Sequence, residues 1–213
     1  MLLNNNLQRD MRLYIVGMTG GIGSGKSEAT KSFVALSVPI IDLDVIAHQI
    51  TQKGYAGYIE IIKYFGNIYL DKNKKINRKS LKVDIFNSRE LRSKIESILH
   101  PIIFKECKKQ ICKYKAAEYI VIVIPLLFET KNYIKLIDES LFIDCDKETQ
   151  FKRVSTRDKL NKKLINSIIN SQLPRDEKIK KAYKVIENNL SKDYLKHEIG
   201  KYHKELKAKI NRK

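Results

Sequence analysis

A glycine-rich segment near the start of the chain has the residue types and the spacing of a phosphate-binding loop. Residues 20–27 read Gly-Gly-Ile-Gly-Ser-Gly-Lys-Ser and fit the pattern G-x-x-x-x-G-K-[ST]. Glycines let the backbone curl so that its N–H groups point at phosphate oxygens. Lys26 supplies a positive charge for the terminal phosphates, and the Ser27 hydroxyl is a ligand for Mg²⁺. The predicted site for ATP and Mg²⁺ consists of Gly21, Ile22, Gly23, Ser24, Gly25, Lys26, Ser27 and Glu28.

Two other interpretations of this segment are a dinucleotide-binding turn and a glycine-rich turn without function. In the dinucleotide pattern G-x-G-x-x-G, counted from Gly21, Lys26 stands where the last glycine belongs. A turn without function is disfavoured because the glycines, Lys26 and Ser27 lie between an apolar segment and a helical segment, as the phosphate-loop pattern requires.

Two acidic residues, Asp42 and Asp44, follow a second apolar segment at 39–41. In parallel α/β sheets the site lies outside the carboxyl ends of the strands. A carboxylate there could orient an attacking hydroxyl or accept its proton. Alternatively, Asp44 caps the helix predicted at 45–50, because Asp is a favoured N-cap residue. Position alone leaves both interpretations open.

The strongest apolar segment, 119–124, runs into Pro125 and two leucines and not into an acidic residue. Switch ATPases and motor proteins usually carry an acidic residue at the end of such a strand. Its absence favours a small-molecule kinase, in which the acceptor hydroxyl and its base lie beside the γ-phosphate.

The elements that must position these residues alternate between strands and helices. Apolar segments predict strands at 13–16, 39–42, 119–124, 141–145 and 184–187. Spacings of three and four residues predict helices at 28–36, from 45 to about 99, and at 102–114, 149–172 and 194–210. In the last of these, the apolar residues at 195, 199, 202, 206 and 210 form one face, and the opposite side is rich in lysine. Pro101 is predicted to end a helix near His100. The alternation predicts an α/β fold with a P-loop NTPase-type parallel sheet of five strands and helices on both faces, interrupted by a helical insertion.

Composition excludes several classes of protein. The chain has 213 residues, 43% of them hydrophobic and 31% charged, as in ordinary globular proteins. Three Cys without a C-x-x-C pair exclude a disulfide scaffold and disfavour a zinc site. The longest apolar run, Tyr119–Phe128, is too short to span a bilayer, and the first residues lack a signal-peptide pattern. A soluble, cytoplasmic protein with no membrane partner is therefore expected.

The formal net charge of +18 has two explanations. A basic surface attracts polyanions, which would fit a nucleic-acid-associated NTP-binding protein. Alternatively, an AT-rich genome produces a chain rich in Lys, Ile and Asn. We favour the second explanation because Arg, the residue of bidentate base contacts, is scarce and the lysines are spread along the chain. We expect neither a nucleic acid nor an obligate protein partner.

From about residue 17 to 189 the chain resembles the dephospho-CoA kinase family. Many kinases share the loop, but the ordered set of motifs is specific. The set comprises Gly17–Ser27, Ile41–Asp44, Ile46-Ala47, Tyr64–Gly66, Asn77-Arg78 with Leu81, Val83 and Phe86, Ile98–Pro101, Pro125–Leu127 with Glu129, Glu148–Gln150, Lys152-Arg153, Arg157-Asp158, Gln172, Arg175 and Val185–Asn188.

The resemblance implies that ATP phosphorylates the ribose 3′-hydroxyl of dephospho-CoA, giving coenzyme A and ADP in the last step of coenzyme A synthesis. It also implies roles for individual residues. Asp44, Lys26 and Arg153 would act in catalysis, Arg157 would bind ATP from a mobile lid, and Thr19, Asp44, Arg78 and His100 would contact the substrate. Spacing alone would make the two lid arginines part of a solvated helix beside Asp158, Arg78 a helix start and His100 a structural histidine. Another P-loop nucleoside or small-metabolite kinase is the nearest alternative.

The polar, unpatterned first residues and the resemblance together divide the chain into regions. These are a disordered extension at 1–10 (or an upstream start before Met11), a nucleotide-binding core at 11–44 and 101–147, a helical substrate-binding domain at 45–100, a lid at 148–174, and the rest of the core at 175–213 with a basic terminal helix. The chain departs from the family pattern at three places. Glu28 replaces a usual Thr and puts negative charge near the phosphates, His48 replaces a usual Arg, and Ala182-Tyr183-Lys184 replaces Ala-Asp-Asp.

Overall fold

The computed structural model describes residues 13–158 and 162–212, so the extension predicted at 1–10 lies outside the described residues. The chain forms two compact units. The first, here called the core unit, comprises the described residues up to Ile40 and from Tyr114 onward. The second, here called the helical unit, is Ile41–Lys113. The region bounds given above remain predictions.

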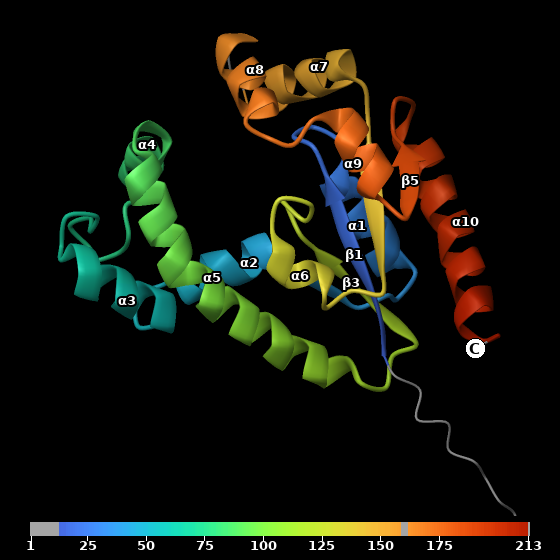
Figure 1. The fold of residues 1–213 in the computed structure, drawn as a ribbon, viewed down its shortest axis with the longest axis horizontal. Coiled ribbons are helices and arrows are strands. Elements are labelled where there is room, and N and C mark those ends of the chain that lie inside the picture. Colours follow the sequence, from blue (N-terminus) through green and yellow to red (C-terminus); the bar gives the residue numbers. More distant parts are fainter. Residues whose placement is uncertain (1–12, 159–161, 213) are drawn as a thin grey trace, which may run out of the picture. The chain divides into compact units, whose positions relative to one another are not determined.

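The chain contains a five-stranded sheet, three of whose strands (β1, β3 and β5) are labelled in Figure 1, and the strand order is β2-β3-β1-β4-β5. The strands are β1 (Tyr14–Gly20), β2 (Ile40–Asp42), β3 (Tyr119–Val123), β4 (Glu139–Asp144) and β5 (Lys184–Glu187). β1 pairs in parallel with β3 and β4, and β4 pairs in parallel with β5. Every residue of β3 and β4 is buried, as in strands covered on both faces. The predicted P-loop-type sheet is confirmed, and β1 runs four residues beyond its predicted end at residue 16.

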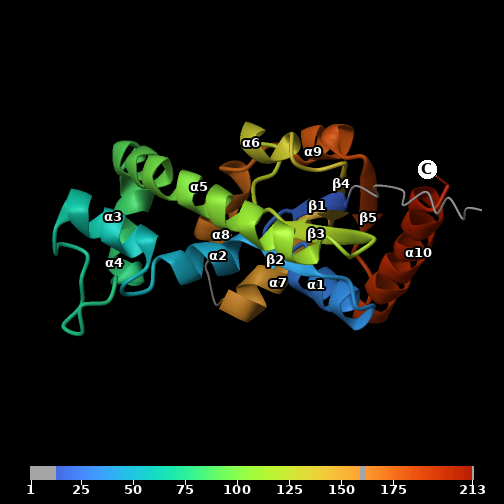
Figure 2. The same ribbon diagram turned by 90° about the horizontal axis from the view of Figure 1, so that it is seen from below.

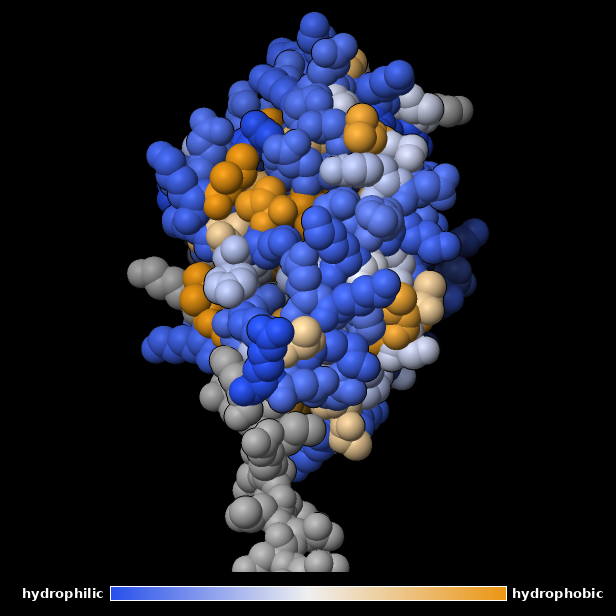
Figure 3. All heavy atoms as spheres, turned by 90° about the vertical axis from the view of Figure 1, so that its right-hand side faces the viewer, coloured by the Kyte–Doolittle hydropathy of each residue, from blue (hydrophilic) through white to orange (hydrophobic). Residues whose placement is uncertain are grey.

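Helices lie on both faces of this sheet. α1 (Lys26–Ala35) and α10 (Lys192–Ile210) pack against each other, and α6 (Lys131–Ile134) and α9 (Arg175–Lys181) lie on the side opposite α1 (Figure 2). The apolar stripe predicted in the tail is the buried face of α10, with Leu195, Ile199, Tyr202 and Leu206 in the main core. The side of the molecule that carries α10 is mostly hydrophilic (Figure 3), as its lysine-rich back requires.

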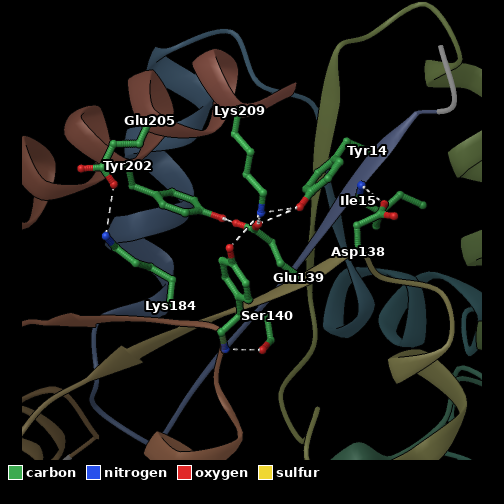
Figure 4. A network of polar contacts seen from close by, with 10 residues as sticks. Tyr14, Ile15, Asp138, Glu139, Ser140, Lys184, Tyr202, Glu205 and Lys209 are labelled. Carbon is green, nitrogen blue, oxygen red and sulfur yellow. Dashed lines mark hydrogen bonds and ion pairs between the residues drawn. The ribbon is translucent and has the colours of Figure 1, made fainter. Parts of the chain in front are cut away.

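A polar network fixes α10 to the beginning of β4 (Figure 4). The carboxylate of Glu139, whose side chain is 2% exposed, accepts hydrogen bonds from Lys209 Nζ (2.5 Å), Tyr14 Oη (2.7 Å) and Tyr202 Oη. Lys209 also donates to the hydroxyl of Tyr183, at 3.1 Å. Burial alone would raise the pKa of Glu139, but these hydrogen bonds outweigh it and the pKa is lowered.

The helix predicted at 149–172 is instead two helices, α7 (Lys147–Asp158) and α8 (Lys162–Asn170). Residues 159–161 of the predicted helix lie outside the described residues. α6 and α9 were not predicted; they have four and seven residues, too short for a periodic pattern.

The helical unit consists of α2 (Leu43–Ile50), α3 (Ala56–Phe65), α4 (Arg78–Asn87) and the long α5 (Arg89–Ile111), which contacts the other three. A short 3₁₀ turn, Cys112–Tyr114, follows α5. The prediction that Pro101 ends a helix is wrong, because α5 continues through it. Proline removes one backbone hydrogen bond, and burial of Ile95 before it and Ile103 after it fixes both halves of α5. Among the described residues, no helix has both the length and the apolar character needed to cross a bilayer.

Candidate active site

The glycine-rich segment forms a loop between the end of β1 and the start of α1. Gly23 and Gly25 have φ angles of +71° and +95°, which side-chain-bearing residues rarely adopt. Gly25 is the N-cap of α1, and its carbonyl accepts from the N–H of Glu28 (2.9 Å) and of Ala29 (3.0 Å). Backbone N–H groups at the amino end of a helix point toward the segment before it and carry partial positive charge, so they make this loop a site for an anion.

Side chains from later in the chain press against three glycines of this loop. A Cβ on Gly21 would lie 2.5 Å from Gln150 Nε2, and one on Gly23 would lie 2.9 Å from a methyl of Val154. A Cβ on Gly25 would collide with the Asn188 amide. These positions therefore need glycine for packing as well as for conformation.

The charged side chains of the loop have definite partners. Lys26 Nζ donates to the carbonyl oxygens of Gly20 and, at 3.2 Å, of Gly21, so its charge lies on the loop itself. Ser27 is exposed in the first turn of α1. The Glu28 carboxylate lies 3.4 Å from Lys31 Nζ and 4.0 Å from Lys192 Nζ, so two lysines offset the negative charge that sequence analysis placed near the phosphates.

The two arginines of the predicted lid differ in their contacts. Arg153 donates to the carbonyl oxygens of Gly23 (3.5 Å) and Leu190 (3.4 Å), which puts its guanidinium at the phosphate loop. Arg157 instead makes two bonds of 2.7 Å to its neighbour Asp158, and its side chain is 63% exposed. The catalytic role of Arg153 and the ATP contact of Arg157 remain predictions.

Thr19, near the end of β1, lies at the carboxyl edge of the sheet. It is buried, and its hydroxyl donates to the Pro125 carbonyl at 3.3 Å. The N–H of Ile124 donates to the carbonyl of Met18 at 2.8 Å, which continues the pairing of β1 with the segment after β3. Thr19 thus joins the two strand ends beside the loop.

Asp42 and Asp44 have different positions at the start of α2. Asp42 is the N-cap, and its Oδ1 accepts from the N–H of Asp44 (2.8 Å) and of Val45 (3.4 Å). The alternative that Asp44 caps the helix is therefore wrong, because the helix begins two residues earlier than predicted. Asp44 is an exposed residue of the first turn. Its role in catalysis remains a prediction.

Arg78 and His100 are both in the helical unit. Arg78 is the first residue of α4, and its Nη2 donates to the His48 carbonyl (2.9 Å) and the Thr51 hydroxyl (2.5 Å) at the end of α2. Arg78 thus ties α4 to α2. His100 is exposed in the middle of α5 and not at a helix end, as the structural alternative had supposed. The substrate contacts of Arg78 and His100 remain predictions.

Sequence comparison identifies the family. The family model for dephospho-CoA kinase matches residues 14–193. The dephospho-CoA kinase of Chromobacterium violaceum is 40% identical over 84% of this chain and 87% of its own, and that of Coxiella burnetii is 39% identical over 88% and 94%. The chain belongs to the dephospho-CoA kinase family.

Solved structures agree with this assignment. Dephospho-CoA kinase from Campylobacter jejuni superposes with a TM-score of 0.67 at 31% identity, over 90% of this chain and 96% of its own. A shikimate kinase from Acinetobacter baumannii superposes with a TM-score of 0.55 at 14% identity, over 93% and 96%, which indicates a shared fold alone. The chain is a kinase of the P-loop fold.

Two polar residues at the carboxyl edge of this kinase were missed as site residues. Asp144 ends β4, with a side chain 2% exposed, and accepts from Arg175 Nε (2.9 Å) and Nη2 (2.5 Å). Asn188 follows β5, and its amide donates to the Ser24 carbonyl of the loop at 2.8 Å. Asp144 lies near the end of the strand predicted at 141–145, and Asn188 directly follows the strand predicted at 184–187, so their positions at strand ends could have identified both.

A buried thiol also lies under the loop. The Cys145 Sγ is 3.8 Å from the Gly23 carbonyl, and burial raises its pKa to about 11, so it is a neutral thiol at physiological pH.

Residues 182–184, where the chain departs from the family pattern, have a structural role. The Tyr183 N–H donates to Ser140 at 3.0 Å and its hydroxyl contacts Lys209, while Lys184 pairs with Glu205 of α10 at 3.1 Å. These residues attach α10 to the sheet.

Proposed function

We propose that this chain transfers the γ-phosphoryl group of ATP to the ribose 3′-hydroxyl of dephospho-CoA, giving coenzyme A and ADP. The observation that carries the proposal is the glycine loop with Lys26 at the amino end of α1, in a chain of the dephospho-CoA kinase family. The fold alone would not choose the acceptor, because shikimate kinases share it.

The loop residues fit a nucleotide with its metal ion. Among the described residues, the Ser24 hydroxyl is a buried polar atom without a hydrogen-bond partner, in the loop that would receive the phosphates. Lys26 would neutralise the terminal phosphates, as the lysine of this motif does. The exposed Ser27 hydroxyl would hold Mg²⁺, which when bound offsets further phosphate charge.

Asp44 is the group that would orient the 3′-hydroxyl and accept its proton. Asp42 already caps α2, so the Asp44 carboxylate is not required to begin that helix. Positioning of this kind, with the hydroxyl aligned for in-line attack, accounts for most of the rate enhancement in phosphoryl transfer.

The remaining roles concern charge and the exclusion of water. Arg153, held at the Gly23 and Leu190 carbonyls, would stabilise charge on the phosphoryl group during transfer. Arg157 would leave Asp158 to contact ATP when α7 and α8 close over the nucleotide. Thr19, Arg78 and His100 would contact the substrate. We infer that the reaction takes place in the cytoplasm.

A direct assay tests the proposal. The full chain is incubated with ATP and Mg²⁺ and with dephospho-CoA, its 3′-deoxy analogue, adenosine or shikimate, while ADP release and the mass of the product are measured. We expect turnover with dephospho-CoA and none with the 3′-deoxy analogue, because the acceptor oxygen is missing. Turnover with a nucleoside but not with dephospho-CoA would replace the proposal with the neighbouring kinase class.

A further inference from the structure

A buried lysine of α9, which neither the motifs nor the mechanism uses, lies close to the phosphate loop. Lys178 has a side chain 9% exposed, although lysine is almost never buried unless it is paired. Its Nζ donates to Gln172 Oε1 at 3.1 Å and lies 4.0 Å from the Glu129 carboxylate. Burial lowers the pKa of Lys178, and the nearby carboxylates of Glu129 and Asp144 oppose that shift.

The partners of Lys178 connect it to the strand ends. Glu129 follows β3, and its Oε1 also accepts from the Leu173 N–H at 3.0 Å. The segment from Gln172 to Lys178 is therefore held to the carboxyl edge through Glu129. A second attachment is the Asp144–Arg175 pair described above.

Gln172 in turn reaches the phosphate loop. Gln172 and Lys178 line a cavity of about 380 Å³ together with Gly21, Gln150 and Asp144. A Cβ built on Gly21 would lie 3.6 Å from Gln172 Oε1, so this amide faces the loop at Gly21, beside the nearer amide of Gln150. The amide is kept there by the ammonium of Lys178, because Gln172 has rotatable bonds that could otherwise turn it into solvent.

We propose that Lys178 is a positioning residue for nucleotide binding: its ammonium holds the Gln172 amide against Gly21, so that the loop and the end of the lid keep the arrangement that receives the phosphates. The proposal rests on ATP being the phosphoryl donor, as in the proposed function. Lys178 makes its polar contacts with Gln172 and Glu129. Its effect passes through Gln172, so losing either residue damages the same step.

The test measures the Kd of a non-hydrolysable ATP analogue, together with kcat and both KM values, for the full chain. Lys178→Met keeps the length of the side chain without the charge and is expected to raise the analogue's Kd and the KM for ATP roughly tenfold, the effect of losing a hydrogen bond to a charged group. The KM for dephospho-CoA should change less than about twofold. Lys178→Arg should recover most of the affinity, and Lys180→Met, an exposed lysine of the same helix, should match the wild type.

A double-mutant cycle decides whether Lys178 acts through Gln172. If it does, Lys178→Met adds little to the affinity loss of Gln172→Ala; full additivity of the two losses overturns the proposal, as does unchanged analogue binding in Lys178→Met. If Lys178→Met does not fold, judged by thermal unfolding, wild-type affinity in Gln172→Ala refutes the proposal. A wild-type chain that binds the analogue but does not phosphorylate dephospho-CoA defeats the proposed function and leaves this inference standing.

Discussion

The polar network beneath α10 gives the sharpest prediction about stability. Replacing Lys209 with Met removes the cation from Glu139, whose side chain is 2% exposed, while the Lys209 side chain is 33% exposed. Breaking a buried pair by removing one partner costs about 3–5 kcal/mol. Because Lys209 is partly solvated and Tyr14 and Tyr202 still donate to Glu139, we expect the lower end, a loss of about 3 kcal/mol.

Thermal and urea unfolding, followed by circular dichroism at pH 7, measure this loss. For a chain of this size, about 3 kcal/mol corresponds to a fall in Tm of about 6–12 °C. The matched control is Lys207→Met on the same helix, because Lys207 pairs with Glu118 at 3.2 Å with both side chains about two-fifths exposed. That control should cost less than about 1 kcal/mol. Equal effects of the two substitutions would refute our account of the network.

The double substitution Lys209→Met with Glu139→Gln separates lost packing from an uncompensated charge. Once Glu139 carries no charge, the missing ammonium should matter less, so the double variant should be more stable than Lys209→Met alone. A double variant whose loss is the sum of the two single losses would mean that the charges do not interact.

The ion pair between Glu139 and Lys209 also makes the stability of the fold depend on pH. The pKa of Glu139 is lowered from its usual 4.5, so its contribution to stability is present above 4.5 and is lost as pH falls through the folded-state pKa. The pKa of Lys209 is raised from 10.5 by its bonds to Glu139 and the tyrosines, against the effect of burial, so its contribution is complete below 10.5. Both are fully present at pH 7. Urea unfolding from pH 7 to pH 3 should show a steeper acid loss for the wild type than for Glu139→Gln.

The remaining predictions concern catalysis and the start of α2. Lys26→Ala should lower kcat/KM for ATP about a thousandfold, because the phosphates lose their point charge; a coupled ADP-release assay measures it. Asp44→Asn should lower kcat about 10²–10⁴-fold and leave the Kd of an ATP analogue nearly unchanged, and an active variant would remove Asp44 from the mechanism. Asp42→Ala should destabilise the chain by about 1 kcal/mol in urea unfolding through loss of the N-cap, whereas Asp44→Asn should not.

Much of the fold could be predicted from apolar patterns. β5 was predicted with its observed bounds, and the stripe of α10 was predicted residue by residue, because strand alternation and helical spacing are local properties of the chain. Continuation of α5 through Pro101 was not predictable, because the packing that fixes both sides of the proline comes from other segments. The helices α6 and α9 have four and seven residues, too few for apolar periodicity to predict them.

In the candidate site, too, some features could be predicted from the sequence and others required the structure. The loop and the alternatives for Asp44 came from the sequence, but the choice of Asp42 as N-cap needed the backbone geometry of α2. Gln150 and Asn188 lie more than a hundred residues from the glycines they press against, so no spacing rule connects them to the loop.

By itself, the sequence determined that this chain has a phosphate loop between a strand and a helix and that it resembles a family of small-molecule kinases. The loop can be predicted from sequence because the glycine conformations and the charge of Lys26 act within a few residues of one another along the backbone. Only the tertiary structure decided which distant groups surround that loop. It placed Asn188 on the Ser24 carbonyl, and it joined Lys178 to Glu129 and Gln172. These contacts depend on strand order in the sheet, which brings together the carboxyl ends of strands that lie far apart along the chain.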